Sequence, residues 1–139
     1  SNVRIFCGLC IRKRRMIDIE FVLPICLQGK YLNRINNFLQ YGLINYKECS
    51  YTITLLVDKE EEYLLNKILN PKEHSVKIVN CPKAHEACKV YYYLSHYDKN
   101  LLEKTKWIAK IDDDSVNDVS LLIKNLDLDK IIEGYLLLF

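Results

Sequence analysis

The feature that most constrains the fold is a regular alternation of strand-type and helix-type segments along the chain. Short apolar runs rich in β-branched and aromatic residues predict strands, and longer runs with apolar residues at helical spacing predict helices. We expect strands at residues 20–26, 51–57, 76–79 and 107–111, and helices at residues 30–44, 60–69, 84–97 and 119–126. Strands that alternate with helices over short connections predict an α/β fold, in which helices cover both faces of a mostly parallel sheet.

The fourth predicted strand ends in three consecutive carboxylates. The run from Trp107 to Ser115 reads Trp-Ile-Ala-Lys-Ile-Asp-Asp-Asp-Ser. Side chains alternate along a strand, so we expect Asp112 and Asp114 to project from the same side. Two carboxylates at that spacing suit a divalent cation, with room left for phosphate oxygens and water. The alternative is an acidic turn that begins the next helix, because Asp and Ser are good helix N-caps.

Two earlier strands also end in residues that can carry chemistry. Pro24 and Ile25 lie at the end of the first strand, and Asp58 follows the second. Ligands of open parallel sheets bind outside the carboxyl ends of the strands, so we expect these residues at the ligand edge. The chain contains only four glycines, and none forms a G-x-G-x-x-G or Walker pattern. This disfavours dinucleotide oxidoreductases and P-loop NTPases.

The charge balance gives no general case for nucleic acid or an anionic membrane as partner. Twenty basic and eighteen acidic residues leave a formal net charge of +2. No apolar run approaches the roughly 20 residues of a membrane-spanning helix, and residues 3–11 lack the order of a signal peptide. We expect a cytoplasmic domain at residues 19–139 after a peripheral basic arm at residues 1–18. The cluster Arg12–Arg15 in that arm leaves open peripheral membrane association or salt-dependent binding of nucleic acid.

Cysteine and histidine spacing does not predict a metal site. Cys7 and Cys10 have the spacing of half a zinc ribbon or a redox pair, but no second pair follows at comparable spacing. We expect Cys26 and Cys49 to be small buried residues in apolar elements, and the cysteines to be reduced. A zinc site and a disulfide framework remain the alternatives. The histidines lack ligand-like mutual spacing: His74, His85 and His96.

The helix expected at residues 84–97 carries one apolar stripe, which predicts its buried face. The residues on this stripe are Ala84, Ala87, Cys88, Tyr91 and Leu94. The tyrosines of the run 91–93 point in several directions around the helix, so we expect some rings to meet solvent or a partner. An interaction module that docks a partner through this helix is therefore one alternative function.

With these elements in this order, the chain resembles the nucleotide-sugar-dependent glycosyltransferases of the GT-A fold. The resemblance covers residues 20–126 and includes a strand ending in Val57-Asp58 and a strand ending in the D-x-D-type sequence 112–114. The phrase Ala-Lys-Ile-Asp-Asp-Asp-Ser-Val-Asn at residues 109–117 looks most like the metal-binding segment of the galactosyltransferase and fringe-like branch. The implied fold is a Rossmann-like nucleotide-binding half.

The resemblance implies a nucleoside diphosphate sugar as donor, most simply a UDP-sugar, and Mn²⁺ or Mg²⁺ as cofactor. It implies that the nucleotide is contacted at the strand ends and from the helix before the D-x-D motif, by Pro24, Ile25, Asp58, Lys89, Asp112 and Asp113. The implied metal ligands are Asp112 and Asp114. Lys83 and His85 are secondary candidates for the basic contact that Lys89 would make.

The chain also departs from that family. It ends 25 residues after Asp114, whereas family members continue with a half that binds the acceptor and supplies the catalytic base. We therefore expect either an excised donor-binding half or a naturally short and inactive protein, in which Leu136–Phe139 begin a further strand. A sugar nucleotidyltransferase is another alternative, but the segment 27–30 contains only one glycine and one lysine of the glycine-rich basic loop of such enzymes.

Overall fold

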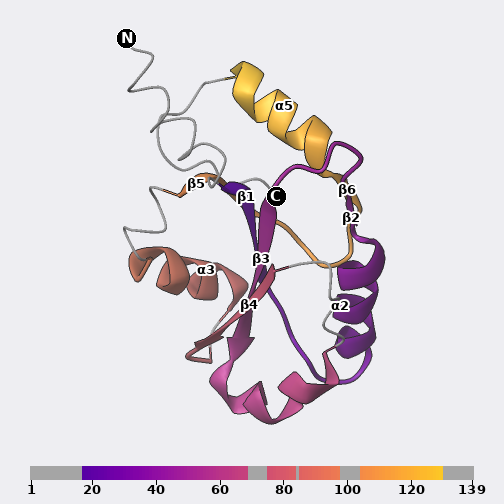
Figure 1. The fold of residues 1–139 in the computed structure, drawn as a ribbon. Helices are drawn as coiled ribbons and strands as arrows, with labels where there is room; N and C mark the ends of the chain where they lie inside the picture. The colour runs from indigo at the N-terminus through magenta and orange to yellow at the C-terminus, as the bar shows by residue number, and fades with distance from the viewer. Residues whose placement is uncertain (1–16, 69–74, 84, 98–103, 130–139) are drawn as a thin grey trace.

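A parallel β-sheet forms the centre of the fold (Figure 1). The computed structural model describes residues 17–68, 75–83, 85–97 and 104–129. Within these residues, the sheet has four strands in the order β4-β3-β1-β5, and each neighbouring pair is parallel. The strands are β1 (Ile17–Pro24), β3 (Tyr51–Asp58), β4 (Ser75–Cys81) and β5 (Thr105–Lys110). The expected α/β fold with a mostly parallel sheet is confirmed, and its strand order is Rossmann-like.

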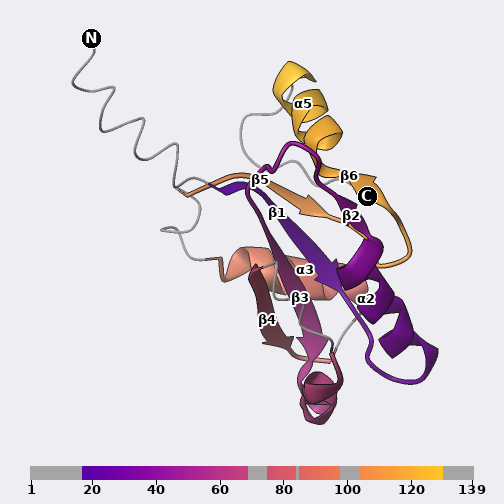
Figure 2. The ribbon, with the colours of Figure 1, turned by 45° about the vertical axis from the view of Figure 1, so that its right-hand side comes forward.

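Helices cover both faces of this sheet (Figures 1 and 2). Helices α2 (Lys30–Tyr41) and α5 (Val119–Asp129) pack on one face, and α3 (Glu86–Ser95) packs on the other. A 3-10 helix, η1 (Lys59–Lys67), follows β3, and two short strands, β2 (Leu43–Ile44) and β6 (Asn117–Asp118), pair in parallel. Within the described ranges, no helix is long and apolar enough to cross a membrane.

The larger hydrophobic core lies between the sheet and helices α2 and α5. Alternate residues of β1, such as Phe21 and Leu23, point into this core and are fully buried. Ile35, Phe38 and Leu39 of α2 cover them, as the helical spacing of apolar residues predicts. Burial of each such side chain stabilises the fold by roughly 1.5–3 kcal/mol.

The opposite face of the sheet is more polar, and this changes which side of α3 is buried. The helix buries Lys89, Val90 and Tyr93. The predicted stripe is wrong, because Ala87, Cys88 and Tyr91 are exposed and Leu94 is half-buried, while Ala84 lies outside the described residues. The physical reason is the presence of two acids on this face of the sheet: Asp58 pairs with Lys89, and Glu20 accepts a hydrogen bond from Tyr93.

Several boundaries differ from the predicted ones. β1 begins at Ile17, so residues 17–18 belong to the sheet and not to the basic arm. The helix expected at residues 30–44 ends at Tyr41, and residues 43–44 form β2 instead. The helix expected at residues 60–69 is the 3-10 helix η1. Four predicted features lie outside the described residues: the pair Cys7 and Cys10, the cluster Arg12–Arg15, His74, and the segment Leu136–Phe139.

The sheet changes its direction of growth at β1. Strands β3 and β4 extend it on one side, and the chain then crosses over through α3 to add β5 on the other side. The crevice outside the carboxyl ends of β1 and β5 is the switch point, where open α/β sheets bind their ligands.

Candidate functional site

The segments that follow β1 and β5 are anchored to neighbouring strands at one edge of the sheet. The Ile25 N–H group donates to the Leu56 carbonyl of β3 at 3.0 Å, and the Ile111 N–H group donates to the Val22 carbonyl of β1 at 3.1 Å. Successive backbone nitrogens of a strand face opposite neighbours, so the nitrogen of Pro24 faces β5. The pairing of β5 with β1 ends at Val22, before this proline. The missing N–H group of this proline therefore costs no ladder hydrogen bond.

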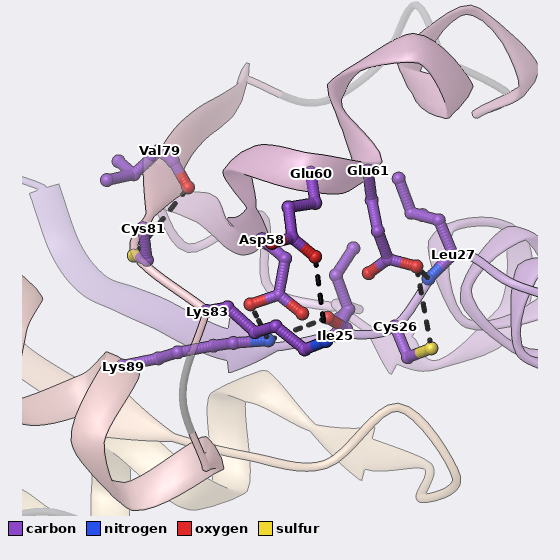
Figure 3. Close-up of polar contacts among 10 residues, drawn as sticks. All are labelled: Ile25, Cys26, Leu27, Asp58, Glu60, Glu61, Val79, Cys81, Lys83 and Lys89. Atoms are coloured by element: carbon purple, nitrogen blue, oxygen red, sulfur yellow. Dashed lines mark hydrogen bonds and ion pairs between the residues drawn. The ribbon is translucent and has the colours of Figure 1, made fainter.

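Lys89 and Asp58 form a buried ion pair at this edge (Figure 3). Lys89 Nζ lies 3.0 Å from Asp58 Oδ1, and the two side chains are 6% and 19% exposed. Lys89 Nζ also donates to the Ile25 carbonyl at 3.5 Å. A charge is tolerated in a protein interior when it is paired, which explains a lysine on the inner face of α3. The structure thus brings together three of the predicted site residues: Ile25, Asp58 and Lys89.

A second buried acid, Glu61, lies at the same edge and is absent from the sequence-based candidates. It is 3% exposed, and its Oε2 accepts hydrogen bonds from the Leu27 N–H group at 3.1 Å and the Cys26 thiol at 3.7 Å (Figure 3). These bonds fasten the loop after β1 to η1. Glu61 Oε1 is buried without a hydrogen-bond partner among the described residues. Sequence reasoning missed it because Glu61 is an acid in a predicted surface helix, and its partners at residues 26 and 27 are far away in the sequence.

The three adjacent carboxylates lie in a turn beyond the end of β5. The strand ends at Lys110, so strand alternation does not set the directions of Asp112 and Asp114. Asp112 Oδ1 accepts a hydrogen bond from Lys110 Nζ at 2.8 Å. Ser115 Oγ donates to the Asp112 carbonyl at 3.0 Å, which stabilises the turn.

Asp113 is the least exposed of the three acids, and it faces α2. Its carboxylate lies 3.9 Å from the Arg34 guanidinium group. Burial raises the pKa of Asp113 above its ordinary value; Arg34 opposes this effect, while the neighbouring Asp114 and Asp112 raise the pKa further. Two cations, Lys110 and Arg34, thus lie beside the carboxylates of this turn.

Asp112 and Asp114 are the two exposed carboxylates of this turn, and carboxylates are a ligand type of divalent cations. In the part of the chain that the structure describes, no group of three or more His, Cys, Asp or Glu side chains is placed to hold a metal ion. Asp112 and Asp114 are exposed, and their carboxylate oxygens are ligands that Mg²⁺ and Mn²⁺ prefer. These residues would hold such an ion together with oxygens from a bound phosphate and water.

Lys83 and His85, the secondary candidates for a basic contact to the nucleotide, are not part of the buried pair of Lys89 and Asp58. Lys83 Nζ is 3.6 Å from Glu60 Oε2, and both side chains are largely exposed (Figure 3). His85 is exposed and immediately precedes α3. The buried thiol of Cys81 lies close to the pair: burial raises its pKa, Lys89 lowers it and Asp58 raises it.

The other described cysteines, and the tyrosines of the run 91–93, lie outside these two groups of residues, the buried pair and the acidic turn. Cys26, Cys49, Cys81 and Cys88 are free thiols, and Cys26 and Cys49 are half-buried rather than fully buried. In the run 91–93, Tyr91 is exposed, Tyr93 is buried, and Tyr92 stacks on His96 with ring centroids 4.4 Å apart. Helix α3 thus exposes one ring of this run rather than a continuous aromatic surface.

The predicted site residues fall into two groups at one edge of the sheet: the buried pair with Ile25, and the acidic turn. No protein-family model, curated protein or solved structure matches the chain. The geometry of these two groups is therefore the basis for assigning a function.

Proposed function

We propose that the chain is a donor-binding domain of a metal-dependent glycosyltransferase, which uses a nucleoside diphosphate sugar. The observation that carries the proposal is the position of the acidic turn. Residues 112–114 begin two positions after the end of β5, which pairs with β1 at the switch point of the sheet. Sheets with this strand order bind nucleotides in the crevice at that point.

The residues around the crevice would have different roles. Asp112 and Asp114 would hold Mn²⁺ or Mg²⁺, which when bound stabilises the negative charge that develops on a departing nucleoside diphosphate. Lys89 would contact the donor from the same edge, in exchange for part of its ion pair with Asp58. The carboxylates of Asp58 and Glu61 are acceptors for the hydroxyl groups of a ribose or the N–H groups of a base. UDP-sugars are the donors to test first.

Calorimetric titration of UDP into the whole chain, with and without Mn²⁺, tests this proposal. We expect saturable binding with Mn²⁺ present and binding about tenfold weaker or worse in Asp114→Asn, which corresponds to about 1.4 kcal/mol. The matched control is Glu48→Gln, which neutralises an exposed carboxylate in the loop between β2 and β3. This variant should bind like the parent chain.

Two outcomes would contradict the proposal. Equal UDP affinity with and without Mn²⁺ would show that the acidic turn does not bind a metal ion that UDP requires. An absence of binding by a sample whose circular dichroism shows a folded protein would favour a non-catalytic interaction module with the same fold.

A further inference from the structure

A hollow of about 650 Å³ lies between α2 and the turn at residues 113–116. It is separate from the buried pair of Lys89 and Asp58, which does not line it. Its volume falls in the range of small-molecule sites, roughly 300–1,000 Å³. Asp114 belongs both to this hollow and to the proposed metal site, so a ligand in the hollow would lie next to the donor.

The apolar part of the hollow consists of one face of α2 and the tip of the turn. Phe38 and Gly42 contribute to it, and Phe38 packs so closely that a Cβ atom at Gly42 would lie 2.2 Å from its ring. Tyr41 and Val116 also line the hollow and are 71% and 66% exposed. An exposed tyrosine ring beside a small hollow offers a flat apolar surface with a hydroxyl group at its edge.

The polar part combines amides with charges that cancel. Asn33 and Asn37 are one helical turn apart on α2, so their amides lie on the same side of the helix and both line the hollow. The cations Lys30 and Arg34 are balanced by the carboxylates at 113 and 114. Arg34 is held by two contacts, because its guanidinium lies 3.9 Å from Asp113 and 5.0 Å from the ring centre of Tyr31.

This lining discriminates between classes of ligand. Because the two cations offset the two carboxylates, the lining has no net charge that would attract an anionic or a cationic ligand. A neutral ligand with many hydroxyl groups meets amides, a guanidinium group and carboxylates that can donate and accept hydrogen bonds. The C–H face of such a ligand can lie against the Tyr41 ring, while the hydroxyl groups of the ligand remain hydrogen-bonded.

We propose that this hollow binds a neutral sugar unit. This sugar site stands independently of the proposed function. Asn37 and Tyr41 are the residues that recognise the sugar, through its hydroxyl groups and its apolar face respectively.

NMR titration of the ¹⁵N-labelled whole chain with neutral methyl glycosides of glucose, galactose and N-acetylglucosamine tests this site, in the absence of metal and nucleotide. We expect at least one glycoside to give saturable shifts of the backbone amides of Asn33, Asn37 and Gly42. Tyr41→Ala should weaken that binding about tenfold, as expected when an aromatic anchor is removed. Tyr46→Ala is the matched control, because Tyr46 is an exposed tyrosine that does not line the hollow.

The outcomes separate the sugar site from the proposed function. The sugar site is overturned if no glycoside shifts these amides, if Tyr41→Ala and Asn37→Ala bind as well as the parent, or if inorganic phosphate shifts them more strongly than any glycoside. Tyr41 and Asn37 are exposed, and the dispersion of amide signals verifies that each variant is folded. Metal-dependent UDP binding without glycoside binding contradicts the sugar site alone, and the reverse result contradicts the glycosyltransferase alone.

Discussion

At the scale of single residues, the buried Lys89 is the clearest case of a charge whose position depends on its partner. Its stem crosses from α3 to the end of β3, where Nζ lies close to both Asp58 Oδ1 and the Ile25 carbonyl. An unpaired charge at this depth would be strongly unfavourable, so each partner makes the burial of the other tolerable.

Replacing Lys89 by Met tests this dependence. The variant keeps the apolar stem but leaves Asp58 without its cation, so we expect the free energy of unfolding to fall by about 3 kcal/mol. Urea denaturation at neutral pH measures the change. Lys83→Met is the matched control, because its ion pair with Glu60 is exposed, and it should change stability by less than about 0.5 kcal/mol. Similar losses in both variants would show that the buried pair does not stabilise the fold.

At the scale of elements, a polar network attaches α3 to the sheet. Glu20 on β1 is buried and accepts hydrogen bonds from the hydroxyl groups of Tyr93 and Tyr97, and from Thr54 Oγ1 at 2.5 Å. Lys77 Nζ donates to the Tyr93 hydroxyl at 3.3 Å. Hydrogen bonds to a charged group contribute about 1.5–3 kcal/mol each, so this network holds α3, and with it Lys89, in place.

The same network predicts a loss of stability at high pH. Burial raises the pKa of Tyr93 and of Tyr97 above the ordinary value for tyrosine, and the hydrogen bonds to Glu20 raise both further. The unfolded chain releases these protons near pH 10, whereas the folded chain retains them. Their contribution to the free energy of unfolding is therefore fully present below about pH 10 and is lost as the pH rises above it.

Urea denaturation between pH 8 and pH 11, with buffers of equal ionic strength, measures this dependence. Tyr93→Phe should be less stable at neutral pH and should show a shallower decline above about pH 10. Tyr63→Phe, which alters an exposed tyrosine, should follow the parent chain throughout. A decline of equal slope in all three proteins would assign the effect to other groups.

At the scale of the whole molecule, the order of the strands brings distant segments to one edge. The proposed nucleotide contacts come from the ends of β1, β3 and β5 and from α3, so a bound ligand would link elements that are far apart in the sequence. A ligand that binds only the folded chain raises its stability by mass action.

This coupling predicts that Mn²⁺ and UDP together stabilise the chain more than either does alone. At a UDP concentration 100 times its dissociation constant, the free energy of unfolding should rise by about 2.7 kcal/mol. At the same UDP concentration, binding that is tenfold weaker in Asp114→Asn should reduce this gain by at least about 1.3 kcal/mol. Its unliganded stability should not change, because Asp114 is exposed. Denaturation in each ligand condition measures both quantities. An equal gain from UDP alone would contradict a role for the metal.

The sequence by itself determined the alternation of strands and helices, the parallel sheet, and the placement of Ile25, Asp58 and the acidic turn at strand ends. Each of these follows from patterns that are local in the chain: hydrophobic periodicity, β-propensity and the residues next to each strand. The resemblance implied Lys89 as a site residue, but its burial could not be predicted, because a lysine on a helix is ordinarily solvated.

Only the tertiary structure decided which side of α3 is buried, and which other acids are buried in the same part of the fold as Asp58. The hydrogen bond from Tyr97 to Glu20 joins residues 77 positions apart, and no local period encodes such a partner. Glu61 is buried on η1, which is a 3-10 helix, whereas the sequence favoured an ordinary helix for this segment. In both cases burial of a polar side chain depends on a hydrogen-bond partner brought near by the fold, and that partner outweighs the apolar pattern of the segment itself.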